Sequence, residues 1–531
     1  MQVAGGPDSG PVLISRDCGR GTPRRWASLA VLCVSLLMVG MDLTVLHVAV
    51  PTLSGQLLPS GAELLWIVDS EALAVAAGLI TCGTLGDRWG RKRMLMAGFA
   101  VFGLASAGAA FAATPLQLIV ARSVLGIGGA MIMASTPALI RALFPDDRER
   151  TLAVGLWTAA NSVGVATGPL LGGLLIEHFW WGSVFLVNVP VVAAALVAGG
   201  MLVPESRDPR PHRWDAAGAA MSAVGLVGVV YAFQQTGATG GGPLTWGAAA
   251  AGLALLAGFV VRQRRIAEPL LDLSHFADRR FSLAALCIMA CYGAYAALLF
   301  LLTQRLQLVD GQAPLRAGLA LVPLAVANAV GAASAPRLSG RLGRHRGLAG
   351  GLLLMAAALA AFSVLGSAGN IGALVAAGLG SGVVMTLGSD AVLGAAGPER
   401  AGAAGAIQET SFSLGAGLGL ASLGTVLTLV YRSDFGPVPG ATEAQRDAAR
   451  TSLGAASKIA AHLGGRTGAA LLRGARDAFD AGFSAATGIA AGVLVLLGAV
   501  VAVWLRPAGR RRGAGRDEPS RRAVPAPAER C

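Results

Sequence analysis

The sequence predicts an all-α membrane protein with fourteen transmembrane helices, and three observations support this fold class. Hydrophobic residues make up 54% of the 531 residues and charged residues only 13%, with a mean hydropathy of +0.64. A soluble chain of this length needs far more charge to cover its surface. Apolar runs of about twenty residues, the length that crosses a bilayer as a helix, follow one another along most of the chain. The 74 glycines suit close packing of helices in lipid.

The predicted spans follow in order, and each is an apolar run that ends at polar, charged or turn-forming residues. They cover residues 26–50, 64–86, 94–113, 116–140, 151–176, 183–203, 214–235, 243–261, 281–303, 315–335, 347–366, 372–396, 405–431 and 481–505. The tail before the first span is basic, and the tail after the last span is basic and rich in Pro, Gly and Ala. The second tail has the composition of a disordered segment.

Basic residues gather in every second loop between the spans. They are Arg88, Arg91, Lys92 and Arg93; Arg141, Arg148 and Arg150; Arg207, Arg210 and Arg213; Arg262, Arg264, Arg265, Arg279 and Arg280; and Arg337, Arg341, Arg344 and Arg346. The loops at 51–63 and 113–115 contain no Lys or Arg. The positive-inside rule therefore places the basic loops and both tails in the cytoplasm, on one side of the cell membrane. Topology explains the net charge of +13, so no nucleic-acid partner is expected.

One loop on the opposite side is long and mixed in charge. Residues 443–464 have helical periodicity, with Leu453, Ala456 and Ile459 on one stripe. A second helical segment at 469–479 runs into the last span. We therefore expect an external helical hairpin within residues 432–480.

The six cysteines do not predict a disulfide framework or a metal site. Cys33, Cys82, Cys287 and Cys291 lie within apolar runs, and the other two lie in the tails. Cys287 and Cys291 share a helical face, but two thiols without a nearby histidine or acid make a poor metal site. No metal or other cofactor is expected.

The stretch GTLGDRWGRKRML at residues 83–95 places a short, charged loop between two apolar spans. Gly83 and Gly90 permit tight turns and close approach. Asp87 can accept hydrogen bonds from the N-terminus of a neighbouring helix. Arg88 and Arg91, with the bases after them, can pair with acids across an interface or with lipid headgroups. Anchoring by the positive-inside rule explains the bases but not the aspartate or the glycines.

This loop resembles the signature between the second and third helices of the major facilitator superfamily, G-x-L-x-D-R-x-G-R-[KR]. A weaker echo without the aspartate, RLSGRLGRHRG, starts at Arg337. The stretch LIVARSVLGIGGA at 118–130 resembles the family's fourth-helix motif, which contains a buried arginine, here Arg122. It departs from the motif at Leu125, where the family often has glutamine. In the family the first loop latches the two halves of the protein in the outward-facing state.

The stretch GVATGPLLGG at 164–173 resembles the fifth-helix motif of exporters that are antiporters. Its motif residues are Gly164, Gly168, Pro169, Gly172 and Gly173. Three of these glycines recur every fourth residue and leave a groove for another helix, and the proline adds a bend. Packing of small residues alone also explains such a groove.

Further stretches at 41–51, 64–73 and 180–190 resemble the fourteen-helix drug:proton antiporter branch, which includes quaternary-ammonium multidrug exporters. This resemblance covers nearly the whole chain. It implies a cytoplasmic tail at 1–25, a six-helix half at 26–203, two additional helices at 204–262, a second six-helix half at 263–505 and a cytoplasmic basic tail at 506–531. It also implies a monomer surrounded by lipid.

A few ionisable residues lie within the spans, where each costs about 2.5–3.5 kcal/mol unless it faces a cavity or a partner. Asp42 either carries proton or substrate charge or serves as a structural partner of Arg122. Glu409 is the next candidate for carrying proton or substrate charge, because it matches an acid of the family's thirteenth helix, although Ser413 stands where many relatives carry a second acid. Asp69 also matches an acid of the family, and we expect it and Arg122 to take part in proton coupling or substrate charge as well.

Three other ionisable residues have open alternatives. Asp69 and Glu71 are two residues apart and must face different directions. Glu71 is either a cavity acid or a solvated residue near the outer interface. His47 is either a hydrogen-bonded structural residue or a proton relay. Asp390, near the end of its span, suits a capping or interface role.

Aromatic residues attract cations, and methionines adapt to varied shapes. The candidate cargo-binding residues are Met38, Met41, Trp66, Cys291, Tyr292, Tyr295 and Phe412. Each of them could instead pack against neighbouring helices or face lipid.

The resemblance implies proton-coupled efflux of amphipathic, cationic drugs or antibiotics, driven by the proton gradient without a cofactor. Two alternatives remain open. One is a self-resistance exporter of a single endogenous antibiotic, and the other is a membrane sensor that uses the transporter fold without turnover. The sequence contains no phosphate-binding loop and no nucleophile motif, so enzymatic activity is not expected.

Overall fold

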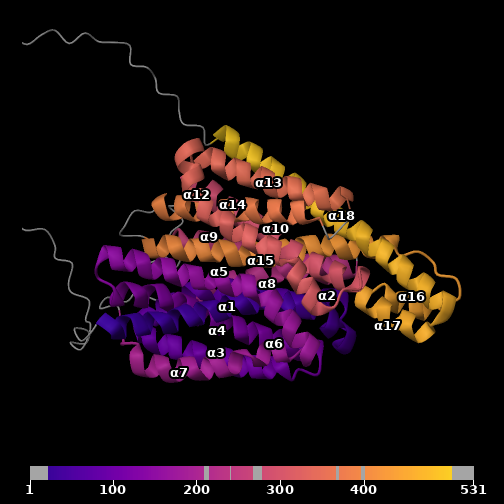
Figure 1. The fold of residues 1–531 in the computed structure, drawn as a ribbon, viewed down its shortest axis with the longest axis horizontal. Helices are drawn as coiled ribbons and strands as arrows, with labels where there is room; N and C mark the ends of the chain where they lie inside the picture. Colours follow the sequence, from indigo (N-terminus) through magenta and orange to yellow (C-terminus); the bar gives the residue numbers. More distant parts are fainter. Residues whose placement is uncertain are drawn as a thin grey trace, which may run out of the picture.

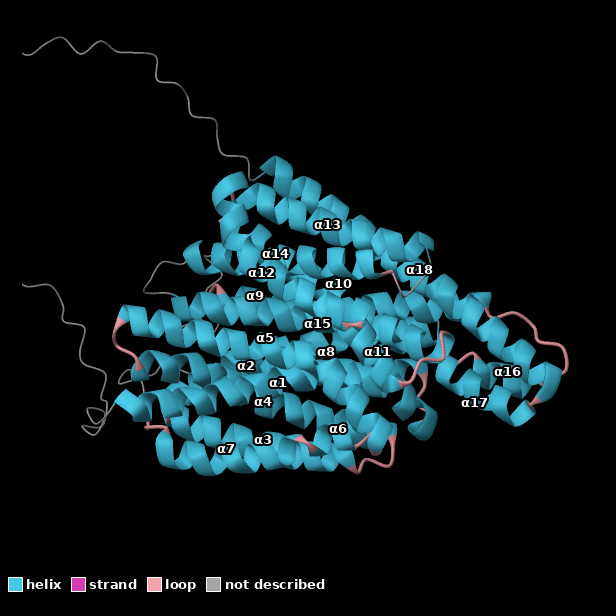
Figure 2. Ribbon diagram, in the orientation of Figure 1, coloured by secondary structure: helices cyan, strands magenta, loops and turns pink. Residues whose placement is uncertain are grey.

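The computed structural model describes residues 22–207, 215–239, 241–266, 278–365, 370–395 and 401–504. Within these residues the chain is built from helices joined by short loops (Figure 2). The predicted C-terminal tail and nearly all of the N-terminal tail lie outside the described residues, as do Arg210 and Arg213.

The helices match the predicted spans. In order they are α1 (Thr22–Leu57), α2 (Gly61–Trp89), α3 (Arg91–Ala110), α4 (Pro115–Leu143), α5 (Asp147–His178), α6 (Ser183–Leu186), α7 (Asn188–Leu202), α8 (Ala216–Thr239), α9 (Pro243–Gln263), α10 (Arg279–Gln304), the π-helix η2 (Arg305–Val309), α11 (Pro314–Ala320), α12 (Val322–Leu342), α13 (Arg344–Leu365), α14 (Ile371–Ala395), α15 (Ala401–Asp434), α16 (Glu443–Ala449), α17 (Leu453–Leu463) and α18 (Gly465–Trp504). Thirteen spans among the described residues are long and apolar enough to cross a membrane, and α2, bent by 51°, makes a fourteenth. The predicted all-α membrane fold is confirmed.

Local sequence explains where several helices begin and end. Ser60 and Glu63 form a reciprocal capping box at the start of α2. Thr114 caps α4, and Pro115 occupies its first turn, where no intrahelical N–H bond is lost. Between α2 and α3, Gly90 has φ of +116°, which a residue with a side chain rarely adopts.

The external segment differs in detail from its prediction. The helix expected at 443–464 is interrupted, because the Ser452 hydroxyl accepts a hydrogen bond from Ala455 N–H and starts a new helix, α17. The segment expected at 469–479 is helical and runs into the last span as predicted, because it is the beginning of α18. The segment therefore consists of α16, α17 and the first turns of α18.

Two groups of helices form the body of the molecule, and Figure 1 separates them by colour, indigo to magenta and orange to yellow. In the N-terminal half, α1 packs on α5 and α4 packs on α2 and α3. In the C-terminal half, α12 and α13 pack on α14, while α10 packs on α15 and α13 on α18. The helices α8 and α9 pack on each other, and α8 also contacts α2 and α15.

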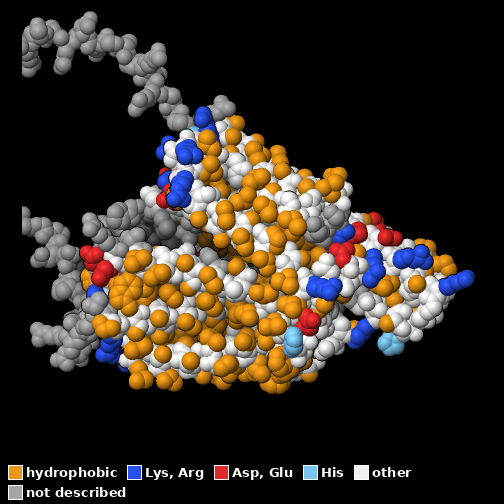
Figure 3. Space-filling model, in the orientation of Figure 1, with side chains coloured by type: hydrophobic (Ala, Val, Ile, Leu, Met, Phe, Trp, Pro, Cys, Tyr) orange, Lys and Arg blue, Asp and Glu red, His pale blue; other side chains and the backbone are white. Residues whose placement is uncertain are grey.

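The molecule has two distinct ends. We call the end with α16 and α17 the hairpin end and the end with the connection between α2 and α3 the loop end. On the face shown in Figure 3, hydrophobic side chains cover the surface between the two ends, while charged side chains gather toward the ends. Large apolar residues such as Leu104 and Val364 are 76% and 83% exposed in this region. An apolar surface of this extent faces lipid rather than water.

Candidate functional site

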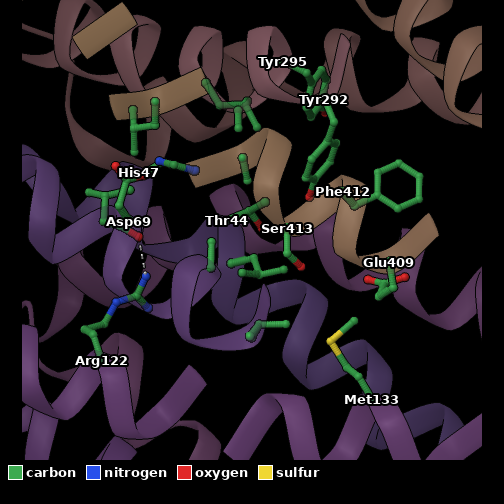
Figure 4. Close-up of a pocket in the computed structure, with 18 residues that line it drawn as sticks. Thr44, His47, Asp69, Arg122, Met133, Tyr292, Tyr295, Glu409, Phe412 and Ser413 are labelled. Atoms are coloured by element: carbon green, nitrogen blue, oxygen red, sulfur yellow. Dashed lines mark hydrogen bonds between the residues drawn. The ribbon is translucent and has the colours of Figure 1, made fainter. Parts of the chain in front are cut away.

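A cavity lies between the two halves, and five helices line it. Thr44 and His47 come from α1, Asp69 from α2 and Arg122 from α4. The residues from α10 and α15 are mainly aromatic and polar: Tyr292, Tyr295, Glu409, Phe412 and Ser413. Figure 4 shows His47, Asp69 and Arg122 on one side of the cavity and Glu409, Phe412 and Tyr292 on the other. The cavity measures about 60 Å³, whereas pockets that hold drug-sized ligands measure about 300–1,000 Å³, so a bulky ligand requires the halves to move.

The N-terminal wall of the cavity contains a fully buried ion cluster. Arg122 Nη1 lies 3.1 Å from Asp42 Oδ2 and 2.5 Å from Glu71 Oε2, and none of the three side chains is more than 2% exposed. Arg122 also donates hydrogen bonds to the backbone carbonyls of Ile67 and Val68, at 3.1 and 3.3 Å. One cation therefore faces two carboxylates.

This geometry bears on the alternatives that the sequence left open for Glu71 and Asp42. The solvated alternative for Glu71 is wrong, because its side chain is 0% exposed and contacts Arg122. Asp42 is a partner of Arg122, which was one of the two alternatives for this residue. It lies behind the cavity rather than in its lining. Glu71 is also absent from the lining.

Asn188, at the start of α7, is a member of this cluster that the sequence analysis did not single out. Its amide nitrogen donates a 2.6 Å hydrogen bond to Asp42 Oδ1 and a weaker one to Ser106 Oγ at 3.5 Å. All three residues are buried. An asparagine inside the apolar stretch WWGSVFLVNVP was the available signal, because a buried amide requires partners.

Asp69 occupies a separate environment on the same helix as Glu71. Gln234 Nε2 of α8 donates a 2.9 Å hydrogen bond to Asp69 Oδ2, and both residues are 1% exposed. No arginine or lysine of the described residues forms an ion pair with Asp69. The two acids face different partners, as their spacing along a helix predicts.

The C-terminal wall of the cavity combines aromatic rings with a free carboxylate. Tyr292 stacks on Tyr295 with ring centroids 6.3 Å apart and meets Phe412 edge-on at 5.2 Å. Within the described part of the chain, Glu409 forms neither an ion pair nor a side-chain hydrogen bond. An unpaired carboxylate beside aromatic rings is a suitable site for an organic cation.

Other predicted cavity residues lie elsewhere or lack the expected contacts. Met38, Met41 and Cys291 are buried but do not line the cavity, and Trp66 packs against the apolar cluster of α2, α8 and α15. His47 does line the cavity, but its Nδ1 has no hydrogen-bond partner among the described residues.

The charged loop between α2 and α3 packs against its own half. Arg91 donates from Nη2 and Nε to Asp87 Oδ1, at 2.7 and 2.9 Å. The segment after α7 binds the backbone of the loop: Arg91 N–H donates to Ser206 O, and Lys92 N–H donates to Glu205 Oε1. Gly90 leaves room for the Glu205 carboxylate. In the described residues, no ion pair of this loop reaches the C-terminal half, and Arg88 is exposed.

The echo of this loop in the C-terminal half has a different partner for its bases. Arg344 Nη2 pairs with Asp390 Oδ2 at 2.6 Å, although both side chains are at least half exposed. Asp390 comes from α14, so an acid from a neighbouring helix meets the loop that lacks its own aspartate.

The glycines of the motif on α5 allow two close helix contacts. Gly164, Gly168 and Gly172 face α1, and an added Cβ at Gly172 would lie 2.8 Å from Val45 O. Gly173 instead faces α11 of the other half, where an added Cβ would lie 2.7 Å from Leu315 Cα, and Pro169 O lies against Gly318. The motif therefore sits at the junction of the two halves.

Comparison with known proteins agrees with this architecture. The family model of the Major Facilitator Superfamily matches residues 32–420. The multidrug efflux pump LfrA of Mycolicibacterium smegmatis is 38% identical over 92% of this chain and 99% of its own length. The methyl viologen resistance protein SmvA of Salmonella typhimurium is 36% identical over 92% of this chain and 99% of its own. The tetracenomycin C resistance and export protein of Streptomyces glaucescens is 32% identical over 92% and 93%.

Solved structures show the same fold at low identity. A bacterial homologue of the human lysosomal transporter Spinster has a TM-score of 0.65 at 17% identity, covering 91% of this chain and 98% of that one. The family model covers more than half of the sequence, and the helices form two halves around a central cavity. The chain is a multi-pass membrane transporter, not an enzyme, and it belongs to the Major Facilitator Superfamily.

Proposed function

We propose that this chain exports amphipathic, cationic drugs across the cytoplasmic membrane in exchange for protons. The observation that carries the proposal is the unpaired carboxylate of Glu409 beside Tyr292 and Phe412 in the cavity. A bare carboxylate in a low-dielectric site is costly, so it favours binding either a proton or a cation. A drug cation that binds beside Glu409 supplies the missing counter-charge.

The proposal assigns different roles to the acids of the cavity region. Glu409 recognises the charge of the drug, while Asp42 carries the proton in the cluster with Arg122. Release of Asp42 from Arg122 would couple protonation to movement of the helices that hold them, α1 and α4. No cofactor takes part, and the proton gradient supplies the energy. The chain works as a monomer in lipid.

The loop end is the cytoplasmic end in this proposal, because basic loops stay on the cytoplasmic side. Two contacts between the halves lie toward the hairpin end: Gln307 Nε2 donates to Val48 O, and Gly173 packs on Leu315. Drugs would therefore reach the cavity from the loop side in this state, and opening at the hairpin end would release them.

The names of the relatives support export of drugs, and one of them supports a narrower alternative. The Streptomyces relative is named a tetracenomycin C resistance and export protein. A self-resistance exporter of one antibiotic would use the same cavity with a narrower range of cargo. A panel of dyes, biguanides, quaternary amines and antibiotics in a growth assay separates the two functions.

Efflux from loaded cells, with and without a protonophore, tests the roles of the two acids. Asp42→Asn should abolish proton-driven export of every substrate. Glu409→Gln should weaken export of divalent methyl viologen more than that of monovalent ethidium, by on the order of tenfold, because one charge–charge attraction is lost per extra cationic charge. Glu177→Gln, which changes an exposed acid at the end of α5, is the control.

Undiminished proton-driven export by Asp42→Asn at matched protein levels would remove that residue from the mechanism. Equal losses for both cargoes in Glu409→Gln would move Glu409 from recognition of the drug to proton coupling.

A further inference from the structure

The inserted helix α8 contacts both halves of the transporter through two successive residues. Gln234 hydrogen-bonds to Asp69 of the N-terminal half, and the Phe233 carbonyl accepts a 3.0 Å hydrogen bond from Thr425 Oγ1 of the C-terminal half. An apolar cluster of Leu73, Ala76, Leu226, Val230 and Ala421 joins α2, α8 and α15 around these bonds. Helix α8 of the inserted pair is therefore bonded to both halves.

The helices α8 and α9 are also fastened to each other. At the loop end, Asp215 accepts hydrogen bonds from Arg262 Nε at 2.9 Å and from Gln263 Nε2 at 3.0 Å. The hydrogen bonds from Arg262 hold the pKa of Asp215 below its usual value. The aspartate therefore stays ionised at neutral pH, and the pair is joined as one unit.

Gln234 carries chemistry that suits a group changing its protonation state. Its Nε2 donates to Asp69, and its Oε1 is buried without a partner among the described residues. An amide has both donors and an acceptor, whereas a guanidinium has donors only. A carboxylate can accept from Nε2, and a protonated carboxyl can donate to Oε1, so one side chain can hold Asp69 in both states. A buried acceptor without a partner costs free energy, which favours use of this oxygen.

We infer that Gln234 is a positioning residue for Asp69, through which the inserted pair α8–α9 takes part in proton coupling. This inference rests on the proposed proton-coupled function. It assigns to the inserted pair a role beyond enlarging the lipid-facing surface. Because α8 also binds the C-terminal half, a change at Asp69 is transmitted to the contact between the halves.

The surroundings of Asp69 contain other groups that titrate or carry charge. They are Asp42 and His47 on α1, Glu71 on α2 itself, Arg122 on α4, Tyr292 and Tyr295 on α10, and Glu409 on α15. α8 itself contributes no charged residue, and Tyr231 is its titratable group. Among the described residues the side-chain hydrogen bond to Asp69 comes from Gln234 rather than from any of these groups, so its removal isolates one interaction.

The test compares the pH dependence of ethidium export in Gln234→Leu and in the unchanged full-length protein. Leucine is similar in size but donates no hydrogen bond. Leucine removes the hydrogen bond to either form of Asp69, but the bond to the ionised carboxylate is the stronger of the two. Its loss therefore favours the protonated form, so the pH of half-maximal export should rise by about one unit. Thr425→Val is the matched control, because it removes a hydrogen bond of α8 without touching an acid.

A second measurement covers variants that do not transport. The pH dependence of ethidium binding to purified protein, followed by fluorescence polarisation, is compared in the Asp69→Asn background, where Gln234→Leu should add no further shift. An unchanged pH profile for Gln234→Leu, or an equal shift for Thr425→Val, would overturn the inference. If a protonophore leaves export by the unchanged protein unaffected, the proposed proton coupling fails, while the binding profile still decides the role of Gln234.

Discussion

Arg122 is the residue on which the buried charges of the N-terminal half depend. It contacts Asp42 and Glu71 and donates to two backbone carbonyls, and it is 1% exposed. A buried ion pair gives little net stability compared with apolar packing, but removing one partner leaves an uncompensated charge that costs about 3–5 kcal/mol. The balance between positive and negative charge in the cluster therefore matters more for stability than any single contact.

Arg122→Gln should lower the apparent melting temperature of the purified transporter, because two carboxylates lose their cation. Neutralising both acids as well, with Asp42→Asn and Glu71→Gln, should recover most of the loss. Arg93→Gln is the control, since Arg93 is 71% exposed and pairs only loosely with Glu205 at 3.7 Å. A melting temperature of Arg122→Gln equal to that of the control would show that the acids are not ionised together in the folded state.

At the scale of the element, the glycines of α5 decide how closely α1 can approach. Gly164 leaves no space for a methyl group against the Leu37 carbonyl, whereas a Cβ at Gly155, on the same helix, would meet no atom within 4 Å. Helix association in lipid relies on this close packing because apolar surface by itself gives no preference for protein over lipid. A glycine is therefore required at one position of α5 and not at the other.

Gly164→Ala should therefore reduce the amount of folded transporter and its export activity, while Gly155→Ala should be neutral or slightly stabilising because alanine favours helix by up to about 1 kcal/mol over glycine. Fluorescence-detected size-exclusion chromatography and ethidium efflux measure both quantities. Equal behaviour of the two variants would indicate that α1 and α5 separate easily.

At the scale of the whole molecule, the loop between α2 and α3 is bound to its own half in this structure. Asp87 pairs with Arg91, and Glu205 and Ser206 hold the backbone. If the loop latches the halves in another state, Asp87 must exchange partners during the cycle. The present contacts would then represent the released form of the latch.

Asp87→Asn should leave the protein at normal levels in the membrane but reduce export, because a neutral amide cannot replace the anion with either of its two partners. Immunoblotting and efflux at matched expression measure the two effects. Asp447→Asn, which changes an acid of α16 that is 65% exposed, is the control. Full export by a normally expressed Asp87→Asn variant would exclude a latch at this residue.

The hairpin end joins the halves through α17, whose Gly454 lies against Ser54 of α1. A Cβ at residue 454 would be 3.0 Å from Ser54 Cβ, close to the spacing of a disulfide, about 3.5–4.5 Å. In a background without the native cysteines, Ser54→Cys with Gly454→Cys should cross-link on oxidation and block export, and a reductant should restore it. Single-cysteine variants treated with oxidant are the controls. Export that continues through the cross-linked protein would mean that this contact stays closed throughout the cycle.

Properties carried by contiguous residues were predictable from the sequence. The length of an apolar run determines whether it spans a bilayer, and the capping box at Ser60 or the glycine at position 90 acts on its immediate neighbours. The membrane class and the order of the spans follow from such local properties. The interruption in the external helix at Ser452 escaped prediction because its periodicity continues across the break.

What the sequence by itself determined is the membrane fold, its helices, and the small set of buried ionisable residues. Only the tertiary structure decided their partners: Asp42 with Arg122 at a separation of 80 residues, and Asp69 with Gln234 at 165. The physical reason is that a buried charge must find a partner, but its residue type does not say which helix will supply it. That choice is made by the packing of helices that are distant in the chain, including the inserted α8.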